Sequence, residues 1–276
     1  MRLTPLGCLA GMPAAGLASS GYLVQHGDTL VLLDAGPGVA ARLSAERTSP
    51  LTAVFISHEH TDHLFDLLAI GKTVLAERLR RDDEHGPLRL DEGIPPVPLY
   101  VPRGAAARLR QLAEIYPVTT HPLLDRAFDL GFACHEYEPG ESFRIGDLDA
   151  STALMQHVAP DCGIRLEADG ESLVYTGDTG VTDAIAELAN GAGTLLAEST
   201  LRETDRSGHG HLSSLDAARA ARDAGVADLV LTHFSSPDPA EHRWHRDRAA
   251  MVFDGPVATV RPGIAHPVSS SRKVLA

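Results

Sequence analysis

Residues 52–64 read Thr-Ala-Val-Phe-Ile-Ser-His-Glu-His-Thr-Asp-His-Leu. An apolar, strand-like segment leads directly into four potential metal ligands, His58, His60, Asp62 and His63. Three imidazole rings this close together indicate a metal site, because in a packed core each ring would need its own hydrogen-bond partner. Residues two apart in an extended chain point to the same side, so His58 and His60 are expected to face one metal. Asp62 and His63 lie beyond the bend and are expected to face a second metal.

Further segments of the chain resemble one known family in the order of its motifs, over about residues 1–265. The string His-x-His-x-Asp-His resembles the signature of the metallo-β-lactamase fold, and Asp34 in Leu-Leu-Asp-Ala-Gly-Pro-Gly resembles an early aspartate that supports the ligands. His157 resembles the third histidine, Asp178 in Thr-Gly-Asp-Thr-Gly the bridging aspartate, and His233 in Leu-Thr-His-Phe-Ser the last histidine. Gly-His-Leu-Ser around His211 is similar to the extra catalytic histidine of ribonuclease Z-like enzymes and related phosphodiesterases.

The resemblance implies a dinuclear metal centre. It assigns His58, His60 and His157 to one metal, Asp62, His63 and His233 to the other, and Asp178 as the bridge between them. Two zinc ions are expected, although imidazole and carboxylate ligands also suit manganese, iron or nickel. His60 stands where the iron-binding oxygen-reductase branch usually has a carboxylate, which favours zinc. Asp178 replaces the cysteine typical of the β-lactamases themselves, which argues against lactam hydrolysis.

Three residues are expected to take part in catalysis: Asp62, His211 and Glu198. Asp62 is also a ligand, and His211 is the candidate that supplies a proton to the leaving group. Glu198 follows the apolar segment 194–197 and would orient or charge His211. The alternatives are a surface histidine at His211, an ordinary strand-end carboxylate at Glu198 and a turn-capping aspartate at Asp34.

Strand and helix patterns alternate along the chain, and candidate ligands repeatedly follow strands. Together with the resemblance, this predicts an α/β protein in which residues 1–276 form a single metallo-β-lactamase-like αββα domain, with two mixed β-sheets packed face to face and helices outside. Local patterns predict a hairpin of strands Tyr22–Val24 and Thr29–Leu33, a helix from Asp62 to about Arg81, and an exposed excursion at residues 82–98. Asp228–Thr232 is expected to be a buried strand that delivers His233.

Composition limits the kind of protein further. The chain has 276 residues, 43% of them hydrophobic, and a net charge of −13. No apolar segment approaches the roughly 20 residues that span a bilayer. Three cysteines, an odd number, argue against a disulfide framework and for a cytoplasmic location. The acidic balance repels a polyanion on average, so we expect an anionic small-molecule substrate and disfavour nucleic acid and membranes. A homodimer is left open.

Three functions fit these features, and a metal-free binding module is disfavoured because every ligand position is filled. The first is hydrolysis of a small phosphodiester, for example a cyclic nucleotide, by attack of a metal-bound hydroxide. The others are a thioesterase- or lactonase-type ester hydrolase in a biosynthetic pathway, and a tRNA 3′-processing ribonuclease. Ribonuclease Z carries a tRNA-binding arm between its third histidine and its bridging aspartate. Only 21 residues separate His157 from Asp178, mostly a predicted hairpin, so the first function is favoured.

Two other features have both a binding and a structural interpretation. Arg165 could meet an anionic substrate group or lie on a strand surface. The segment His242-Arg243-Trp244-His245-Arg246-Asp247-Arg248 could clamp a phosphate or a base, or form a solvated helix face.

Overall fold

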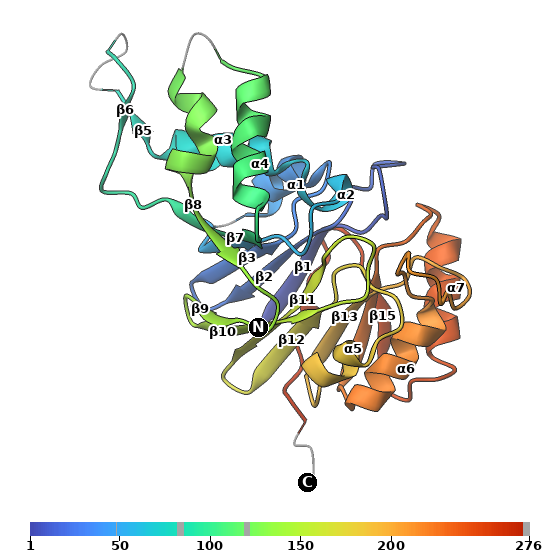
Figure 1. The fold of residues 1–276 in the computed structure, drawn as a ribbon. Coiled ribbons are helices and arrows are strands. Elements are labelled where there is room, and N and C mark those ends of the chain that lie inside the picture. Colours follow the sequence, from blue (N-terminus) through green and yellow to red (C-terminus); the bar gives the residue numbers. More distant parts are fainter. Residues whose placement is uncertain (48, 82–85, 119–121, 273–276) are drawn as a thin grey trace.

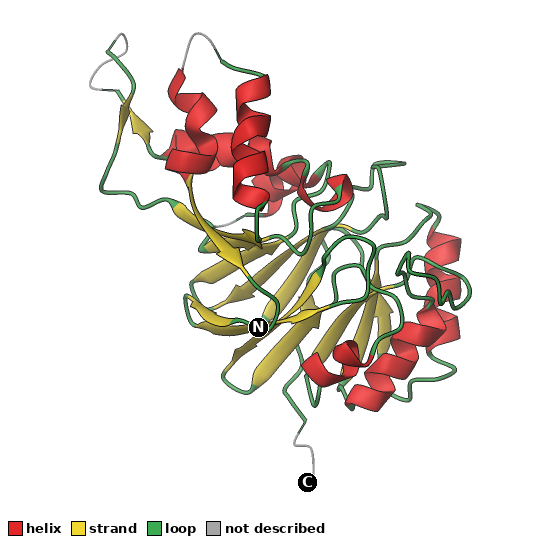
Figure 2. Cartoon of the chain, viewed as in Figure 1, coloured by secondary structure: helices red, strands yellow, loops and turns green. Residues whose placement is uncertain are grey.

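A computed structural model describes residues 1–47, 49–81, 86–118 and 122–272 of the chain. Two seven-stranded mixed sheets pack face to face, and helices cover the outer face of each (Figures 1 and 2). This αββα arrangement is the fold class expected from the sequence. Among the described residues, no helix has the length and apolar character needed to cross a membrane.

Each sheet combines an antiparallel half with a parallel half. The first sheet has the strand order β16 (His266–Pro267), β1 (Arg2–Gly7), β2 (Gly21–His26), β3 (Thr29–Leu33), β4 (Ala53–Phe55), β7 (Val97–Pro102) and β8 (Phe132–Tyr137), and is parallel from β3 to β8. The second has the order β15 (Val257–Thr259), β14 (Asp228–Thr232), β13 (Thr194–Glu198), β12 (Glu171–Tyr175), β11 (Cys162–Ala168), β10 (Leu148–Leu154) and β9 (Ser142–Ile145), and is parallel from β12 to β15.

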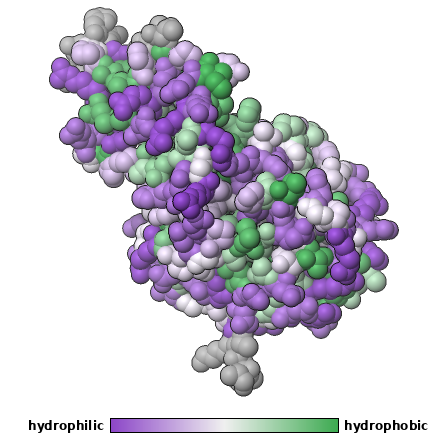
Figure 3. Space-filling model, viewed as in Figure 1, coloured by the Kyte–Doolittle hydropathy of each residue, from purple (hydrophilic) through white to green (hydrophobic). Residues whose placement is uncertain are grey.

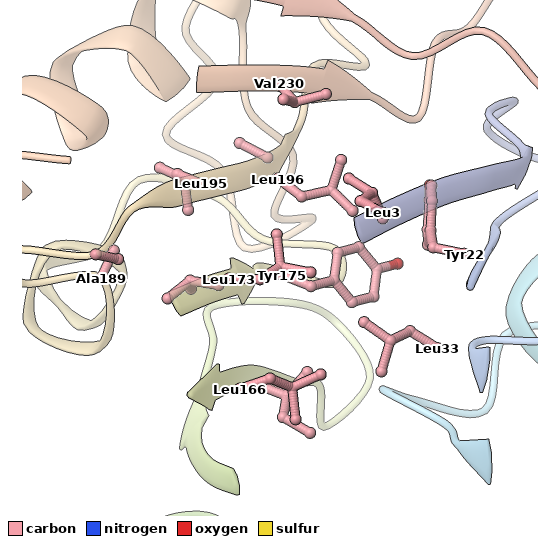
Figure 4. Close-up of a cluster of buried hydrophobic side chains, with 14 of the residues drawn as sticks. Leu3, Tyr22, Leu33, Leu166, Leu173, Tyr175, Ala189, Leu195, Leu196 and Val230 are labelled. Atoms are coloured by element: carbon pink, nitrogen blue, oxygen red, sulfur yellow. The ribbon is translucent and has the colours of Figure 1, made fainter. Parts of the chain in front are cut away.

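Alternating side chains of the strands build two hydrophobic cores. In β3, Val31 and Leu33 belong to the core between the sheets, whereas Leu30 and Leu32 belong to the core under the outer helices. Figure 4 shows side chains of both sheets, such as Tyr22 and Tyr175, meeting in the inner core. The outer helices of the first sheet are α1 (Val39–Glu46), α3 (Leu67–Glu77) and α4 (Ala105–Ile115), and those of the second are α5 (Asp183–Leu188), α6 (Ser214–Ala224) and α7 (Pro239–Ala249).

The expected helix from Asp62 to Arg81 is wrong as one element. It is divided into α2 (Thr61–Leu64) and α3, and the chain then enters the short strand β5 (Leu79–Arg80). The backbone N–H of Asp66 donates to the carbonyl of Ala35 (2.9 Å), and the carbonyl of Asp62 accepts from the N–H of Ser20 (3.2 Å). These two tertiary hydrogen bonds use the groups that a continuous helix would pair with each other, so the helix breaks there.

The exposed excursion expected at residues 82–98 is shorter in the structure. Residues 82–85 lie outside the described residues. Strand β6 (Arg89–Leu90) pairs with β5, and Val97 and Pro98 already belong to β7 of the first sheet. With α3, α4, the 3₁₀ turn η1 (Pro122–Arg126) and the π turn η2 (Ala127–Gly131), this hairpin forms a lobe that projects from the sandwich (Figure 1). The same view in Figure 3 shows apolar and hydrophilic side chains mixed on this lobe and on the sandwich.

Helix boundaries near the later motifs follow the local signals in the sequence. Ser213 caps α6 in a capping box with Asp216, and Gly225, with φ 68°, ends that helix. Asp238 caps α7, and Pro239 occupies its first turn. Glu241 stands where a reciprocal cap would be expected three residues after Asp238, but its carboxylate pairs with Arg202 instead.

Candidate metal centre

One edge of the sandwich collects the polar side chains that the sequence singled out. The loops after β4, β10, β12 and β14 carry, respectively, residues 58–63, His157, Asp178 and His233. Both Asp34, after β3, and His233 adopt left-handed backbone conformations, with φ of 59° and 56°. Non-glycine residues rarely adopt this conformation, and strain of this kind is typical of functional sites.

The first group of converging side chains contains His58, His60, His157 and Asp178, whose ligand atoms all lie within 4.8 Å of one another. His157 Nε2 lies 3.1 Å from His60 Nδ1, and His58 Nε2 lies 3.8 Å from Asp178 Oδ2. His58 is fully buried, whereas His60 and His157 are half-buried at the mouth of the site.

The second group contains Asp62, His63, His233 and again Asp178, and its ligand atoms also lie within 4.8 Å of one another. The Nε2 atoms of His63 and His233 lie 3.2 Å apart. Asp178 Oδ1 is 3.3 Å from the first of these nitrogens and 3.4 Å from the second. Asp62 Oδ2 lies 3.4 Å from His233 Nε2.

Asp178 is therefore shared between the two groups through different oxygens. Its Oδ2 faces His58, and its Oδ1 faces His63 and His233. A carboxylate in this position has the geometry of a bridging ligand, as the resemblance implied.

The residues fit a pair of divalent cations. Donors about 2.0–2.1 Å from one tetrahedral zinc ion would be about 3.3 Å from one another, close to the separations found here. His58 Nε2 is buried and has no hydrogen-bond partner among the described residues. Burial lowers the pKa of His58 to about 3 and that of His157 to about 4, so at pH 7 both rings are neutral and keep a lone pair for a cation.

Hydrogen bonds at Nδ1 aim four of the five histidine rings at the centre. The partner atoms lie on different segments: Ser57 Oγ for His58 (3.1 Å), Asp34 Oδ2 for His63 (2.7 Å), the Gly210 carbonyl for His157 (2.8 Å) and Thr200 Oγ1 for His233 (2.8 Å). Asp161 Oδ2 also lies 2.9 Å from His58 Nδ1. Each bond leaves Nε2 facing the converging group. Metal-binding histidines in proteins are commonly oriented by such bonds.

Asp34 holds the ligand loop, which confirms the functional interpretation of this residue. Its carboxylate accepts hydrogen bonds from the Ser57 N–H (2.7 Å) and Ser57 Oγ (2.9 Å), beside His58. Its Oδ2 also accepts from Tyr175 Oη (2.7 Å), in the second sheet.

Asp161 is a functional residue that the sequence analysis missed. It is fully buried, and its Oδ2 also accepts a hydrogen bond from the backbone N–H of Asp178 (2.8 Å), so it contacts two of the candidate ligands. Gly177, with φ 62°, allows this approach, because a Cβ there would lie 2.3 Å from Asp161 Oδ1. The one signal in the sequence was an acidic residue placed immediately before a strand, four residues after His157.

His211 and Glu198 form a pair at the edge of the centre. His211 Nδ1 lies 2.9 Å from Glu198 Oε1. Glu198 is fully buried and also accepts from the Thr179 N–H (2.7 Å) and the Thr200 hydroxyl (2.7 Å). Burial by itself would lower the pKa of His211, but the hydrogen bond and charge of Glu198 raise it to about 9. The His211 ring centroid is 5.1 Å from that of His157 and 5.7 Å from that of His233, which places the pair beside both groups.

The remaining candidates have structural partners. Arg165 donates to the carbonyls of Leu188 (2.9 Å) and Asn190 (3.0 Å), which supports its interpretation as a strand-surface residue. In the 242–248 segment, now on α7, His245 Nδ1 is bonded to Ser199 Oγ (2.9 Å), and the Trp244 ring contacts the guanidinium of Arg202.

A fold of two mixed sheets with a histidine- and aspartate-rich centre at one edge defines a class of metal-dependent hydrolases. A model of the beta-lactamase superfamily domain matches residues 29–234, and the chain belongs to this superfamily. It is similar to the probable metallo-hydrolase YhfI of Bacillus subtilis, with 31% identity over 95% of this chain and 98% of the relative. It is also similar to a ribonuclease Z of Mycobacterium bovis, with 28% identity over 92% of this chain and 94% of the relative. The chain is thus a metallo-hydrolase of the beta-lactamase superfamily.

Solved structures agree with this assignment. The crystal structure of Bacillus subtilis YhfI superposes with a TM-score of 0.77 at 26% identity and covers 96% of this chain and 99% of YhfI. The short form of human tRNase Z gives a TM-score of 0.73 at 21% identity, covering 97% and 99%. A diphosphatase of the PhnP family gives 0.72 at 16%, covering 99% of each chain. The last two likenesses concern the fold alone.

The geometry predicts two metal equivalents per chain that depend differently on two ligands. Replacing the shared ligand, in Asp178→Ala, should remove most of both equivalents, whereas His58→Ala should mainly empty one site. Elemental analysis of protein purified without chelator measures the stoichiometry. Asp149→Ala, on the exposed side of β10, is the control and should keep both metals. Unchanged metal content in Asp178→Ala would contradict the bridging role.

The two buried aspartates predict site-selective losses of affinity. Asp161→Asn keeps the shape of the side chain beside His58 but replaces its carboxyl group, so it should weaken zinc binding at the His58–His60–His157 site by about 10–100-fold. Asp34→Asn should weaken the Asp62–His63–His233 site instead. Stepwise zinc titration against a competing chelator separates the two affinities. Equal weakening of both sites by both variants would show that these aspartates support the fold and not a particular ligand.

Proposed function

We propose that this metallo-hydrolase is a dinuclear zinc enzyme that cleaves a small phosphodiester, for example a cyclic nucleotide. The single observation that carries the proposal is the His211–Glu198 pair (2.9 Å) beside the two ligand groups. An alkoxide leaving a phosphodiester needs a proton, and a histidine charged by a buried carboxylate can supply one. The alcohol that leaves a small diester would therefore be expected next to His211.

The division of labour follows from the contacts of each residue. The groups that share Asp178 would hold two zinc ions, which would polarise the phosphoryl oxygens and lower the pKa of a water molecule. His211 uses Nδ1 to bond Glu198, and this leaves Nε2 to carry the transferable proton. Because its pKa is raised to about 9, His211 is protonated at neutral pH and becomes neutral only as the pH rises through that value. Glu198, held by Thr179 and Thr200, fixes the orientation of the ring.

The path of the chain between His157 and Asp178 supports a small substrate. This interval contains strands β11 and β12, which pair within the second sheet and are joined at Asp169 and Gly170. A recognition arm has no room in a two-residue turn. The net charge of −13 adds a general repulsion of RNA.

The second candidate is tRNA 3′-end processing. It is favoured by the similarity to the ribonuclease Z of Mycobacterium bovis, which extends over 92% of this chain. It would require tRNA to be bound by a surface other than an arm between His157 and Asp178.

A substrate panel tests the proposal. The zinc-loaded protein is incubated with bis-p-nitrophenyl phosphate, cyclic nucleotides, a thioester, a lactone and precursor tRNA. We expect turnover of a phosphodiester with weak dependence on salt, since few phosphates are neutralised. Cleavage of precursor tRNA at the discriminator base, at a rate that rivals the small diesters, would support the second candidate instead. Preferred turnover of the thioester or lactone would reject both.

The His211 pair predicts a dependence on the leaving group. His211→Ala should keep both metals and lose about 10²–10⁴-fold in rate on an alkyl diester. The loss should shrink for p-nitrophenyl esters, because p-nitrophenolate leaves without a proton. His209→Ala, at an exposed histidine whose ring centroid is 5.2 Å away, is the matched control and should retain activity. An equal loss on all leaving groups would assign His211 to substrate binding.

A further inference from the structure

A cavity of about 340 Å³ lies between α7, α1 and the end of β15, and four of its twelve lining residues are arginines. They are Arg42 on α1, Arg243 and Arg246 on α7, and Arg261 after β15. No aspartate or glutamate is among the described residues that line it. This composition is unexpected in a chain with 37 acidic and 24 basic residues.

The arginines of this cavity are poorly neutralised by the protein itself. Arg246 pairs with Asp247 (2.7 Å), and Arg42 donates to the carbonyl of Gly16 (2.9 Å). The side chains of Arg243 and Arg261 are exposed, and their guanidinium groups form no hydrogen bond or ion pair with the described residues. Among the described residues, the carboxylate of Asp247 is thus the one that pairs with any of the four guanidinium groups. Like charges gathered around a cavity repel one another unless an anion lies between them.

The cavity is a neighbour of the metal centre but separate from it. None of the candidate ligands, nor His211 or Glu198, contributes to its wall. Strand β15 runs parallel to β14, which ends immediately before His233, so Arg261 emerges at the edge of the sandwich that carries the centre. His242, in the cavity wall, stacks on Phe234 with ring centroids 4.0 Å apart.

The loop that follows β1 touches both places. The Gly11 N–H donates to Asp62 Oδ2 (2.7 Å) in the metal centre, and Leu17 lies in the cavity wall, next to the Gly16 carbonyl that Arg42 binds. An anion in the cavity would therefore lie beside the same loop that supports the candidate ligand Asp62.

We propose that this arginine cavity binds a small phosphorylated molecule, at a site distinct from the metal centre. The planar guanidinium fork matches phosphate oxygens with paired hydrogen bonds, and several arginines around one cavity can bind one phosphate group together. The volume is in the range of small-ligand pockets. A nucleic-acid surface would instead present basic residues as an extended stripe. The proposal does not depend on the substrate of the metal centre.

The site is tested by titrating inorganic phosphate into the zinc-loaded protein and measuring the heat of binding by calorimetry. We expect two binding events in the unchanged chain. The double variant Arg243→Ala/Arg261→Ala should weaken one event by at least about tenfold, because it removes the two unpaired guanidinium groups. Asp178→Ala should remove the other event, at the metal centre. Arg222→Ala, at an exposed arginine on α6 that pairs with Asp223, is the control for the loss of an arginine outside the cavity and should keep both.

Two results would overturn the proposal. The first is a double variant that binds phosphate in the same two events as the Arg222→Ala control. The second is a single event in the unchanged chain that Asp178→Ala abolishes. A competition arm compares adenosine monophosphate with a short single-stranded RNA of mixed sequence. Tighter binding of the RNA, lost in the double variant, would replace the small molecule with nucleic acid as the ligand. Since Arg243 and Arg261 are exposed and unpaired, their replacement should leave the melting temperature without phosphate unchanged.

Discussion

The carboxylate of Asp34 is the contact on which the metal centre depends. It lies after the end of β3 and accepts hydrogen bonds from Ser57 in the loop after β4 and from the Tyr175 hydroxyl of the opposite sheet. It is also hydrogen-bonded to Nδ1 of His63. A single buried group therefore joins both sheets to the ligand loop, and it does so in a left-handed conformation with φ 59° that the surrounding hydrogen bonds must stabilise. Each of these contacts is made by protein groups, so the fold itself orients the ligand loop toward the other ligands.

Much of the centre could be predicted from the sequence because its signals are local. The four ligand positions of residues 58–63 lie within six residues, and the other ligands each follow a short apolar strand. A strand that ends at the edge of a sheet places the next side chain at that edge, so order along the chain becomes proximity in space. The caps at Ser213 and Asp238 were predictable for the same reason, since each depends on bonds within a few residues.

What could not be predicted depends on contacts between distant segments. The break between α2 and α3 follows from bonds that Asp62 and Asp66 make with Ser20 and Ala35. The hydrophobic pattern within residues 62–81 contains no information about these distant hydrogen-bond partners. Asp161 was missed for a similar reason. Its role arises from contact with His58, more than a hundred residues earlier, and its spacing from His157 matches no motif that the sequence analysis used.

The charges of the buried carboxylates connect the fold with the chemistry of the metal centre. Asp34, Asp161, Asp178 and Glu198 are almost fully buried within one network, and Asp62 lies at its edge. Repulsion from Asp178 adds to burial and raises the pKa of Asp161 well above its ordinary range. His58 and His157 are neutral at pH 7, so they cannot balance these carboxylates. This negative charge can be reduced by a proton on Asp161, by protonated His63 and His211, or by bound cations. Cations that share Asp178 and face the neutral rings would relieve this repulsion directly, so binding them would also stabilise the folded chain.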